Sequence, residues 1–154
     1  MKYLYTLLLL LIVGCRSTIT EPYYSSDIIN VGYSEKLNYW QPKHIKIKNS
    51  TKKTRAKIVS KGSVILIYQY VIDSNGNTQN INLLKSIPAG VASNEDLINS
   101  MYIYNKWKKS ESNHSVQPVK VTERLVLMPN GNIIVPPDDM DISDFVKSLS
   151  AKRK

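Results

Sequence analysis

Residues 62–76, with the sequence GSVILIYQYVIDSNG, decide the fold. Apolar side chains alternate along this stretch from Val64 to Ile72, which is the period of a β-strand. The residues between them are also largely apolar, so we expect the strand to be covered on both faces or to offer one face to a partner. Asp73–Gly76 has the composition of a turn, and a second strand, Thr78–Lys85, is expected to return antiparallel to the first.

A helix is predicted after the second strand. Ser93 can cap its N-terminus, and Asp96 lies three residues later, which is the spacing of a capping box. Lys106, Lys108 and Lys109 suit the negative C-terminal end of the helix dipole. The apolar face of this helix consists of Leu97, Met101, Tyr104 and Trp107, with Ile98 beside them.

Two further elements complete the expected domain. Pro118 opens a strand at Val119–Met128, and the turn residues 129–132 lead to a short strand at Ile133–Val135. A C-terminal helix follows, with acidic residues at its start and basic residues at its end, as the helix dipole favours. Its acidic and apolar positions are Asp138, Asp139, Asp141, Asp144, Ile142, Phe145, Val146 and Leu149.

The order of these elements predicts an α+β fold: a small antiparallel sheet with a β-β-α-β core, helices on one face and an added C-terminal helix. The chain has 154 residues, 42% of them hydrophobic, which fits one domain with tails and argues against a disordered chain. A single Cys excludes an internal disulfide framework and a cysteine-based structural zinc site.

The N-terminus has the composition of a signal peptide. Lys2 is basic, and Tyr3–Val13 is apolar except for Thr6. As a helix this apolar segment would span roughly 16 Å, which is too short for the hydrocarbon core of a bilayer, about 30 Å thick. It ends in LIVGC, residues 11–15, which resembles the lipobox of bacterial lipoproteins. The resemblance implies cleavage before Cys15 and attachment of lipid to Cys15; the alternative is a buried or chance cysteine.

The residue after the lipidated Cys directs sorting in such lipoproteins, where Asp favours retention in the inner membrane. This chain has Arg16, so the resemblance implies the periplasmic face of the outer membrane, with the inner membrane as the alternative. Arg16–Gly32 is expected to be an extended tether, and Tyr33–Pro42 is apolar enough to dock on another part of the chain. The expected organisation is a signal peptide (1–14), a lipidated N-terminus and tether (15–42), a basic linker (43–61), the sheet domain (62–135) and a C-terminal amphipathic helix with a basic tail (136–154).

The charge of the chain is concentrated in one stretch. Lys and Arg number 21 against 12 Asp and Glu, a net charge of +9, and Lys36–Lys61 contains no acidic residue. Three interpretations stay open: attraction to anionic phospholipid, an acidic protein partner, and a solvated face or loop. Nucleic acid is the usual partner of such a run, but a signal peptide directs the chain away from it, so we expect no nucleic-acid binding.

No group of residues has the spacing of an active site. The two histidines, His44 and His114, are far apart in the sequence, and both lie in polar surroundings. The pattern D-x-N-x-N at residues 73–77 imitates the start of a calcium loop but lacks its Gly and its final Glu, so a hairpin turn is favoured. The acids at 138–144 suit a helix N-terminus without a metal. We therefore expect no catalytic residue, no metal, no cofactor and no small-molecule substrate.

The pattern of the sheet domain resembles one known family. Gly62-x-Val64-x-Leu66-x-Tyr68, the turn, a second strand, a helix ending in Trp107 and the strand at Pro118-Val119 follow the order of the C-terminal domain of TonB-family proteins. The resemblance covers about residues 62–128. It implies a small antiparallel sheet with helices on one face that binds a partner peptide by strand addition. The edge strand implied as the partner site contains Val119, Val121, Glu123, Leu125 and Leu127.

Energy-coupling TonB proteins also need a transmembrane helix that meets their motor and a long Pro-rich span, and this chain has neither. The expected function is therefore protein binding by a membrane-anchored periplasmic lipoprotein, without motor-coupled energy transduction. Its expected partner is a periplasmic or outer-membrane protein, or a second copy of the chain. The alternative is a structural or accessory lipoprotein of an envelope transport or secretion complex.

Overall fold

The structure is a computed structural model that describes residues 21–43, 49–100 and 107–145. Helices make up about 21% of the chain and strands about 36%, so the predicted α+β class is confirmed. Several predicted features lie outside the described ranges: Cys15, His44, the helix residues Met101 and Tyr104, and residues 146–154.

Strand β3 (Val64–Ile72) is the centre of the main sheet. It pairs antiparallel with β4 (Thr78–Ile87) on one side and antiparallel with β6 (Val119–Leu127) on the other. The register between β3 and β6 is continuous along the whole length of both strands. All three strands begin where the sequence predicts them, because each carries a local signal: alternation, a flanking turn or a flanking proline.

Two short strands lie on the outer side of β6. β1 (Ile29–Val31) pairs parallel with Val119–Val121, and β7 (Ile133–Ile134) pairs antiparallel with Val126–Leu127. The order across the sheet is therefore β1–β6–β3–β4, with β7 on the same side of β6 as β1. β7 agrees with the prediction, whereas β1 belongs to the segment that the sequence assigns to a tether.

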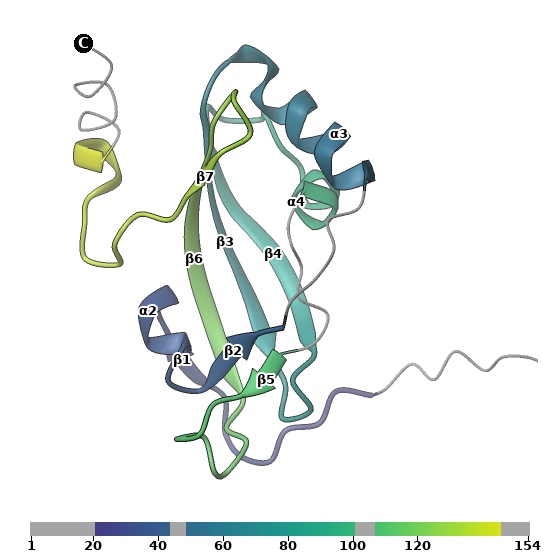
Figure 1. Cartoon of the computed structure of the whole chain (residues 1–154), viewed down its shortest axis with the longest axis vertical. Coiled ribbons are helices and arrows are strands. Elements are labelled where there is room, and N and C mark those ends of the chain that lie inside the picture. The colour runs from purple at the N-terminus through teal and green to yellow at the C-terminus, as the bar shows by residue number, and fades with distance from the viewer. Residues whose placement is uncertain (1–20, 44–48, 101–106, 146–154) are drawn as a thin grey trace, which may run out of the picture.

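A second layer covers one face of the main sheet (Figure 1). A two-stranded antiparallel ribbon and a short helix lie over one end of the sheet, and two helices in contact with each other lie towards the other end. The elements of this layer are α2 (Tyr33–Lys36), β2 (Trp40–Pro42), α3 (Asn49–Ile58), the 3-10 turn η1 (Val59–Lys61), α4 (Asn94–Ser100) and β5 (Trp107–Lys109).

The main hydrophobic core lies between the sheet and this layer, where burial of apolar area is the main stabilising term. A smaller cluster contains Ile65, Val126 and Phe145 on the opposite face of the sheet. Residues 142–145 are helical, and Phe145 packs on the face of the sheet that α3 and α4 leave open. The main core includes Trp40, Ile58, Leu66, Tyr68, Tyr70, Ile72, Leu97, Trp107, Val119 and Val121.

The start of α4 has the predicted capping box. Asp96 N–H donates to Ser93 Oγ at 3.1 Å, and Ser93 N–H donates to Asp96 Oδ2 at 3.1 Å. The reciprocal bonds satisfy two of the donors that a helix N-terminus leaves without an intrahelical partner. α4 covers Asn94–Ser100, and the rest of the predicted helix up to residue 106 lies outside the described residues.

Trp107 belongs to a strand and not to the predicted helix. It begins β5, where it lies opposite Pro42 of β2, and its Nε1–H donates to Thr78 Oγ1 at 2.9 Å. Lys108 and Lys109, which the sequence places at a helix end, are exposed residues of β5. Helical spacing is a local signal, whereas β5 forms because a strand distant in the sequence pairs with it.

Residues 21–42 are folded onto the domain. This agrees with the expected docking of Tyr33–Pro42 and corrects the expectation of an extended tether for the described part of Arg16–Gly32. Ser74 N–H donates to Tyr23 O at 2.8 Å, and Trp40 Nε1–H donates to Gln117 O at 2.8 Å. Trp40 is 2% exposed. This segment carries no period of its own, because its elements are short and satisfy their main chain with partners on other elements.

Candidate functional site

The five residues of the predicted partner site lie along β6, and their side chains face the main core. Val119 and Val121 are fully buried, and Leu125 and Leu127 nearly so. Glu123 is 7% exposed and is the centre of a buried polar cluster. These five side chains hold the fold together, so a partner on this strand would meet main-chain groups and not these side chains.

The backbone N–H and C=O groups of the even-numbered residues of β6 point outward, away from β3. Ile29 N–H donates to Pro118 O at 3.4 Å, and Met128 N–H donates to Asn132 O at 2.9 Å, both on the outer side. Backbone polar groups alternate between the two sides of a strand, and the register with β3 is unbroken. Between these two residues, the backbone groups that point outward belong to Lys120, Thr122, Arg124 and Val126.

Both ends of this outer edge are occupied by the chain itself, so the predicted edge is not a free strand. β1 covers Val119–Val121, and β7 covers Val126–Leu127. The outward main chain of Thr122 and Arg124 lies between them. An unpaired edge is a template for unwanted association, and proteins commonly cover such edges with another part of the chain.

Asp138 bridges the space between β1 and β7. Its carboxylate accepts hydrogen bonds from Tyr33 N–H at 3.2 Å and Ser34 N–H at 2.9 Å, at the start of α2. Met140 O accepts a hydrogen bond from Arg124 Nη1 at 2.7 Å. The segment after β7 is thus bound to α2 and to β6 beside the stretch that β1 and β7 leave uncovered. Asp138, expected at the start of the C-terminal helix, instead caps α2.

The opposite edge of the sheet is β4, and its main chain is irregular. The register with β3 shifts twice, and Asn80 has a φ of +50°. Leu83 N–H donates to Asn94 Oδ1 at 2.5 Å, at the start of α4. Irregular pairing, an N–H already bound by a side chain and the exposed Lys85 all discourage addition of another strand.

The carboxylate of Glu123 accepts hydrogen bonds from three side chains beneath α2. The donors are the ammonium of Lys36 and the phenols of Tyr68 and Tyr70, the last at 2.6 Å. Lys36 Nζ also donates to Tyr70 Oη at 3.1 Å and lies 4.8 Å from the centre of the Trp107 ring. Lys36 is 3% exposed. Within the described part of the chain, every buried side-chain donor or acceptor has a partner.

Burial sets the protonation of this cluster. Desolvation lowers the pKa of Lys36, and the Glu123 carboxylate opposes that shift. Desolvation raises the pKa of Tyr70 well above its ordinary value, and Glu123 raises it further. The pKa of Tyr33 is raised by the same two causes in the same order. An ammonium thus neutralises a buried carboxylate between neutral phenols, and the arrangement anchors α2 to the sheet.

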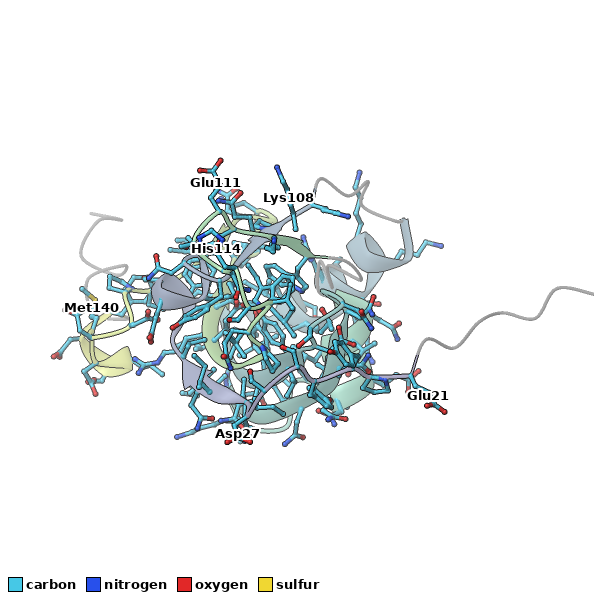
Figure 2. All side chains as sticks on the ribbon, turned by 90° about the horizontal axis from the view of Figure 1, so that it is seen from below. Glu21, Asp27, Lys108, Glu111, His114 and Met140 are labelled. Carbon is cyan, nitrogen blue, oxygen red and sulfur yellow. The ribbon has the colours of Figure 1, made fainter. Side chains whose placement is uncertain are left out.

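Asp73 closes the turn between β3 and β4, as predicted for a hairpin turn. The side chain is fully buried, and its Oδ1 accepts hydrogen bonds from Asn75 N–H at 3.0 Å and Asn77 N–H at 2.8 Å. Its Oδ2 accepts one from Gln79 Nε2 at 3.1 Å. His114 is exposed on the loop after β5 (Figure 2). Among the described residues, no group of three or more His, Cys, Asp or Glu could hold a metal ion.

Sequence reasoning missed three features of this region: the strand β1, the buried Lys36 and the cap at Asp138. Lys36 lies in the basic run, where a charged side chain is expected to face solvent. Its burial depends on Glu123, which sits on an inward-facing position of β6. Glu123 is an acid among the apolar inward-facing residues of β6, and it was the one signal in the sequence for a buried partner. A buried carboxylate needs a cation or several hydrogen-bond donors.

Across the described ranges, no helix has the length and apolar character needed to cross a bilayer. Compared with protein families, curated proteins and solved structures, the chain matches none. A function for the chain therefore follows from its own residues and contacts.

Proposed function

We propose that the chain is a lipid-anchored protein of the bacterial envelope whose folded part is a protein-binding module resembling the TonB C-terminal domain. The order of elements supports this: β3 and β4 form a hairpin, α4 follows, and β6 returns beside β3. Apart from β5 between α4 and β6, that order supports the β-β-α-β core which the resemblance implies. Cys15 would carry the lipid, and the periplasmic face of the outer membrane would be its location.

The observation that carries the proposal is the pairing of β1 with β6. An extended segment already lies on that edge, parallel to Val119–Val121, with the side chain of Val31 buried in the core. A segment of a partner protein can make the same main-chain bonds, which is recognition by strand addition. We infer that partner binding replaces β1 on β6.

The short length of β1 makes such a replacement feasible. Val31 is buried, whereas Ile29 is half-buried and Asn30 is exposed. Burying one Val contributes about 1.5–3 kcal/mol, while fixing the backbone of each residue costs about 1–2 kcal/mol. Each main-chain hydrogen bond adds about 1 kcal/mol. β1 is therefore weakly held, and a longer partner strand that continues along Thr122 and Arg124 has more bonds to gain.

A disulfide that locks β1 in place tests this exchange. Asn30 and Lys120 lie opposite each other, so Asn30→Cys with Lys120→Cys joins β1 to β6. The control lock, Gln69→Cys with Thr122→Cys, joins β3 to β6, which stay together during the exchange. Lipidation blocks the thiol of Cys15, so each variant carries a single engineered pair.

The lipidated variants are crosslinked in their native envelope, and the attached proteins are identified. We expect the β1 lock to abolish capture of the partner, reduction to restore it, and the control lock to leave it unchanged. A β1-locked chain that captures the same partner at full strength contradicts strand exchange. The mass of the N-terminal peptide checks the lipid on Cys15 separately.

One observation favours the alternative of a structural or accessory lipoprotein in an envelope transport or secretion complex. One edge of the sheet is covered by the chain itself, and the other is irregular and partly capped, as suits a scaffold that binds through other surfaces. The same crosslinking separates the two functions. A multi-protein complex that survives the β1 lock supports the alternative.

A further inference from the structure

Two groups of like charge lie on different sides of the described molecule, although single acids such as Glu95 and Glu111 lie near the basic group. Basic side chains collect on the layer that covers the sheet, on α3 and on the β2–β5 ribbon. The exposed acids of residues 138–144 surround Met140, which lies on the far side of the molecule from α3 (Figure 2). Such a separation gives the folded unit an electric dipole, so an anionic surface attracts the basic side and repels the acidic side.

Helix α3 provides the strongest part of the basic side. Its sequence contains no acidic residue, and Lys52, Lys53 and Lys57 are exposed. Lys57 Nζ pairs with Asp96 Oδ1 of α4 at 3.1 Å. Ile58 at the end of the helix is buried in the main core. The helix is therefore fixed to the domain, and its lysines are presented on one rigid surface.

A second group of lysines lies on the β2–β5 ribbon, in the same layer but over the other end of the sheet. Lys43 follows β2 directly, and Lys108 and Lys109 lie on β5; all three are exposed. Lys108 points away from the sheet in Figure 2, beside Glu111. We define the basic face by its six exposed lysines: Lys43, Lys52, Lys53, Lys57, Lys108 and Lys109.

The chemistry of the basic face fits a lipid surface better than a protein. The exposed basic residues of α3 and the ribbon are Lys, a flexible point charge, and Arg55 of α3 is half-buried. Specific protein contacts favour Arg and buried aromatic anchors. Exposed lysines attract a diffuse anionic surface, at about 1 kcal/mol for each Lys near an anionic bilayer. We propose that the basic face docks on the anionic phospholipid headgroups of the membrane that holds the anchor. This inference rests on the proposed lipid at Cys15.

Docking of the basic face orients the partner site. α3 contacts α4, and α4 contacts β4, so the basic helix lies on the β4 side of the sheet. The β6 edge with β1 is on the opposite side, as Figure 1 shows. With α3 against the headgroups, the β6 edge and the acids of residues 138–144 face away from the membrane. A partner strand then reaches the edge from the aqueous side.

A fluorescent probe on α3 tests the docking. Ala56 is exposed between the lysines, and Ser143 is exposed among the acids on the far side. The full lipidated chain with Ala56→Cys or Ser143→Cys carries an environment-sensitive fluorophore in vesicles that contain a headgroup-level quencher. We expect several-fold stronger quenching of the Ala56 probe in vesicles with phosphatidylglycerol than in phosphatidylcholine alone. Added salt should abolish this difference in quenching, because it screens charge. The Ser143 probe should show no such difference.

Two matched charge variants show which lysines act. Lys52→Gln with Lys53→Gln removes two charges from the basic face, and Lys120→Gln with Arg124→Gln removes two from β6, which faces away from the membrane. We expect the first pair to lower the ratio of docked to undocked chain by roughly 30-fold, and the second pair to change it little. If both pairs lowered docking equally, the net charge of the chain alone would attract it to the membrane. That result would overturn the proposal that the basic face docks.

The outcomes separate this inference from the proposed function. Equal quenching of the Ala56 probe with and without phosphatidylglycerol overturns the docking and leaves an acidic protein as the occupant of the basic face. A chain that leaves neutral vesicles, with an unmodified N-terminal peptide by mass, lacks the anchor and contradicts the proposed function instead. Docking to anionic vesicles by such a chain would still support the basic face.

Discussion

Lys36 and Glu123 lie 87 residues apart in the sequence and form an ion pair inside the fold, between α2 and the middle of β6. Gly32 alone separates α2 from β1. The ion pair therefore holds α2 on the sheet whether or not β1 is paired. Displacement of β1 by the proposed partner would then be a local event that ends at Gly32 and removes only Val31 of β1 from the buried core.

Substitution of only one partner of the ion pair is expected to lower the free energy of unfolding strongly. Lys36→Met leaves the Glu123 carboxylate buried without its cation, which costs about 3–5 kcal/mol of unfolding free energy. Lys36→Met with Glu123→Gln removes both charges and should be less destabilised than Lys36→Met alone. Urea unfolding measures both, and the exposed Lys108→Met is the control, with a change within about 0.5 kcal/mol. A Lys36→Met chain as stable as this control contradicts the pairing.

Tyr70 gives the fold a dependence on alkaline pH. Burial and then Glu123 raise its folded-state pKa well above the ordinary 10.0, so above pH 10.0 the folded chain binds more protons than the unfolded chain. Its stabilisation is complete below that pH and is lost as the pH rises through the folded-state pKa. The lowered pKa of Lys36 acts with the opposite sign, because stability rises as the pH climbs from that pKa towards 10.5.

We therefore expect Tyr70→Phe to lose less stability than the natural chain as the pH rises above 10.0, measured by urea unfolding across that range. Tyr24→Phe, at an exposed side chain, is the control for removal of a phenol. The Tyr70→Phe chain should be less stable at neutral pH, since it lacks the bond to Glu123. An equally steep alkaline loss in all three chains would assign the effect to other groups.

Asp138 is expected to stabilise the start of α2. Asp138→Ala removes the acceptor of the Tyr33 and Ser34 amides, which costs about 0.5–2 kcal/mol for a helix cap and should speed hydrogen exchange at those two amides. Asp139→Ala removes the same charge from the exposed neighbouring residue and should leave both amides protected. Unchanged exchange in Asp138→Ala would show that the segment after β7 does not hold α2.

The turn at Gly76 is expected to tolerate no side chain. Gly76 has a φ of +75°, and a Cβ there would lie 2.6 Å from Trp107 O and 3.1 Å from Trp40 Cζ3. Gly131 has a φ of +85° with open space around it, so Gly131→Ala carries the backbone cost alone, about 1–2 kcal/mol. Gly76→Ala should cost at least about 2 kcal/mol more, because β5 must move. Equal losses in thermal unfolding would contradict the close packing of β5 on this turn.

The central sheet could be predicted because its signals are local. The alternation from Val64 to Ile72 and the turn residues after it specify a hairpin within a short stretch. Inward-facing Val119 and Val121 likewise mark β6. Each of these strands is long enough for its period to show, and the sheet joins them into the expected core.

The covering of the sheet could not be predicted, because it depends on contacts between distant residues. β1 and β2 are too short to show a period, and each pairs with a strand far along the chain. Trp107 fits a helical period by its spacing and lies in β5 because of that pairing. Lys36 breaks the rule that lysine faces solvent, since the Glu123 carboxylate and the Tyr70 phenol replace its water. The sequence therefore predicted the strand β6 itself, but its pairing with β1 was not foreseen.

With the proposed lipid on Cys15, the contact at Tyr23 would set how far the domain can stand from the membrane. Ser74 N–H binds Tyr23 O, so the described chain is fastened to the β3–β4 turn almost where it begins. With lipid on Cys15, the link from Cys15 to Tyr23 reaches at most about 30 Å. A partner that displaces β1 and the contacts before it would extend the free link from Cys15 as far as Tyr33 of α2, with a reach of about 60 Å. Capture of a partner and the height of the domain above the bilayer would then change together.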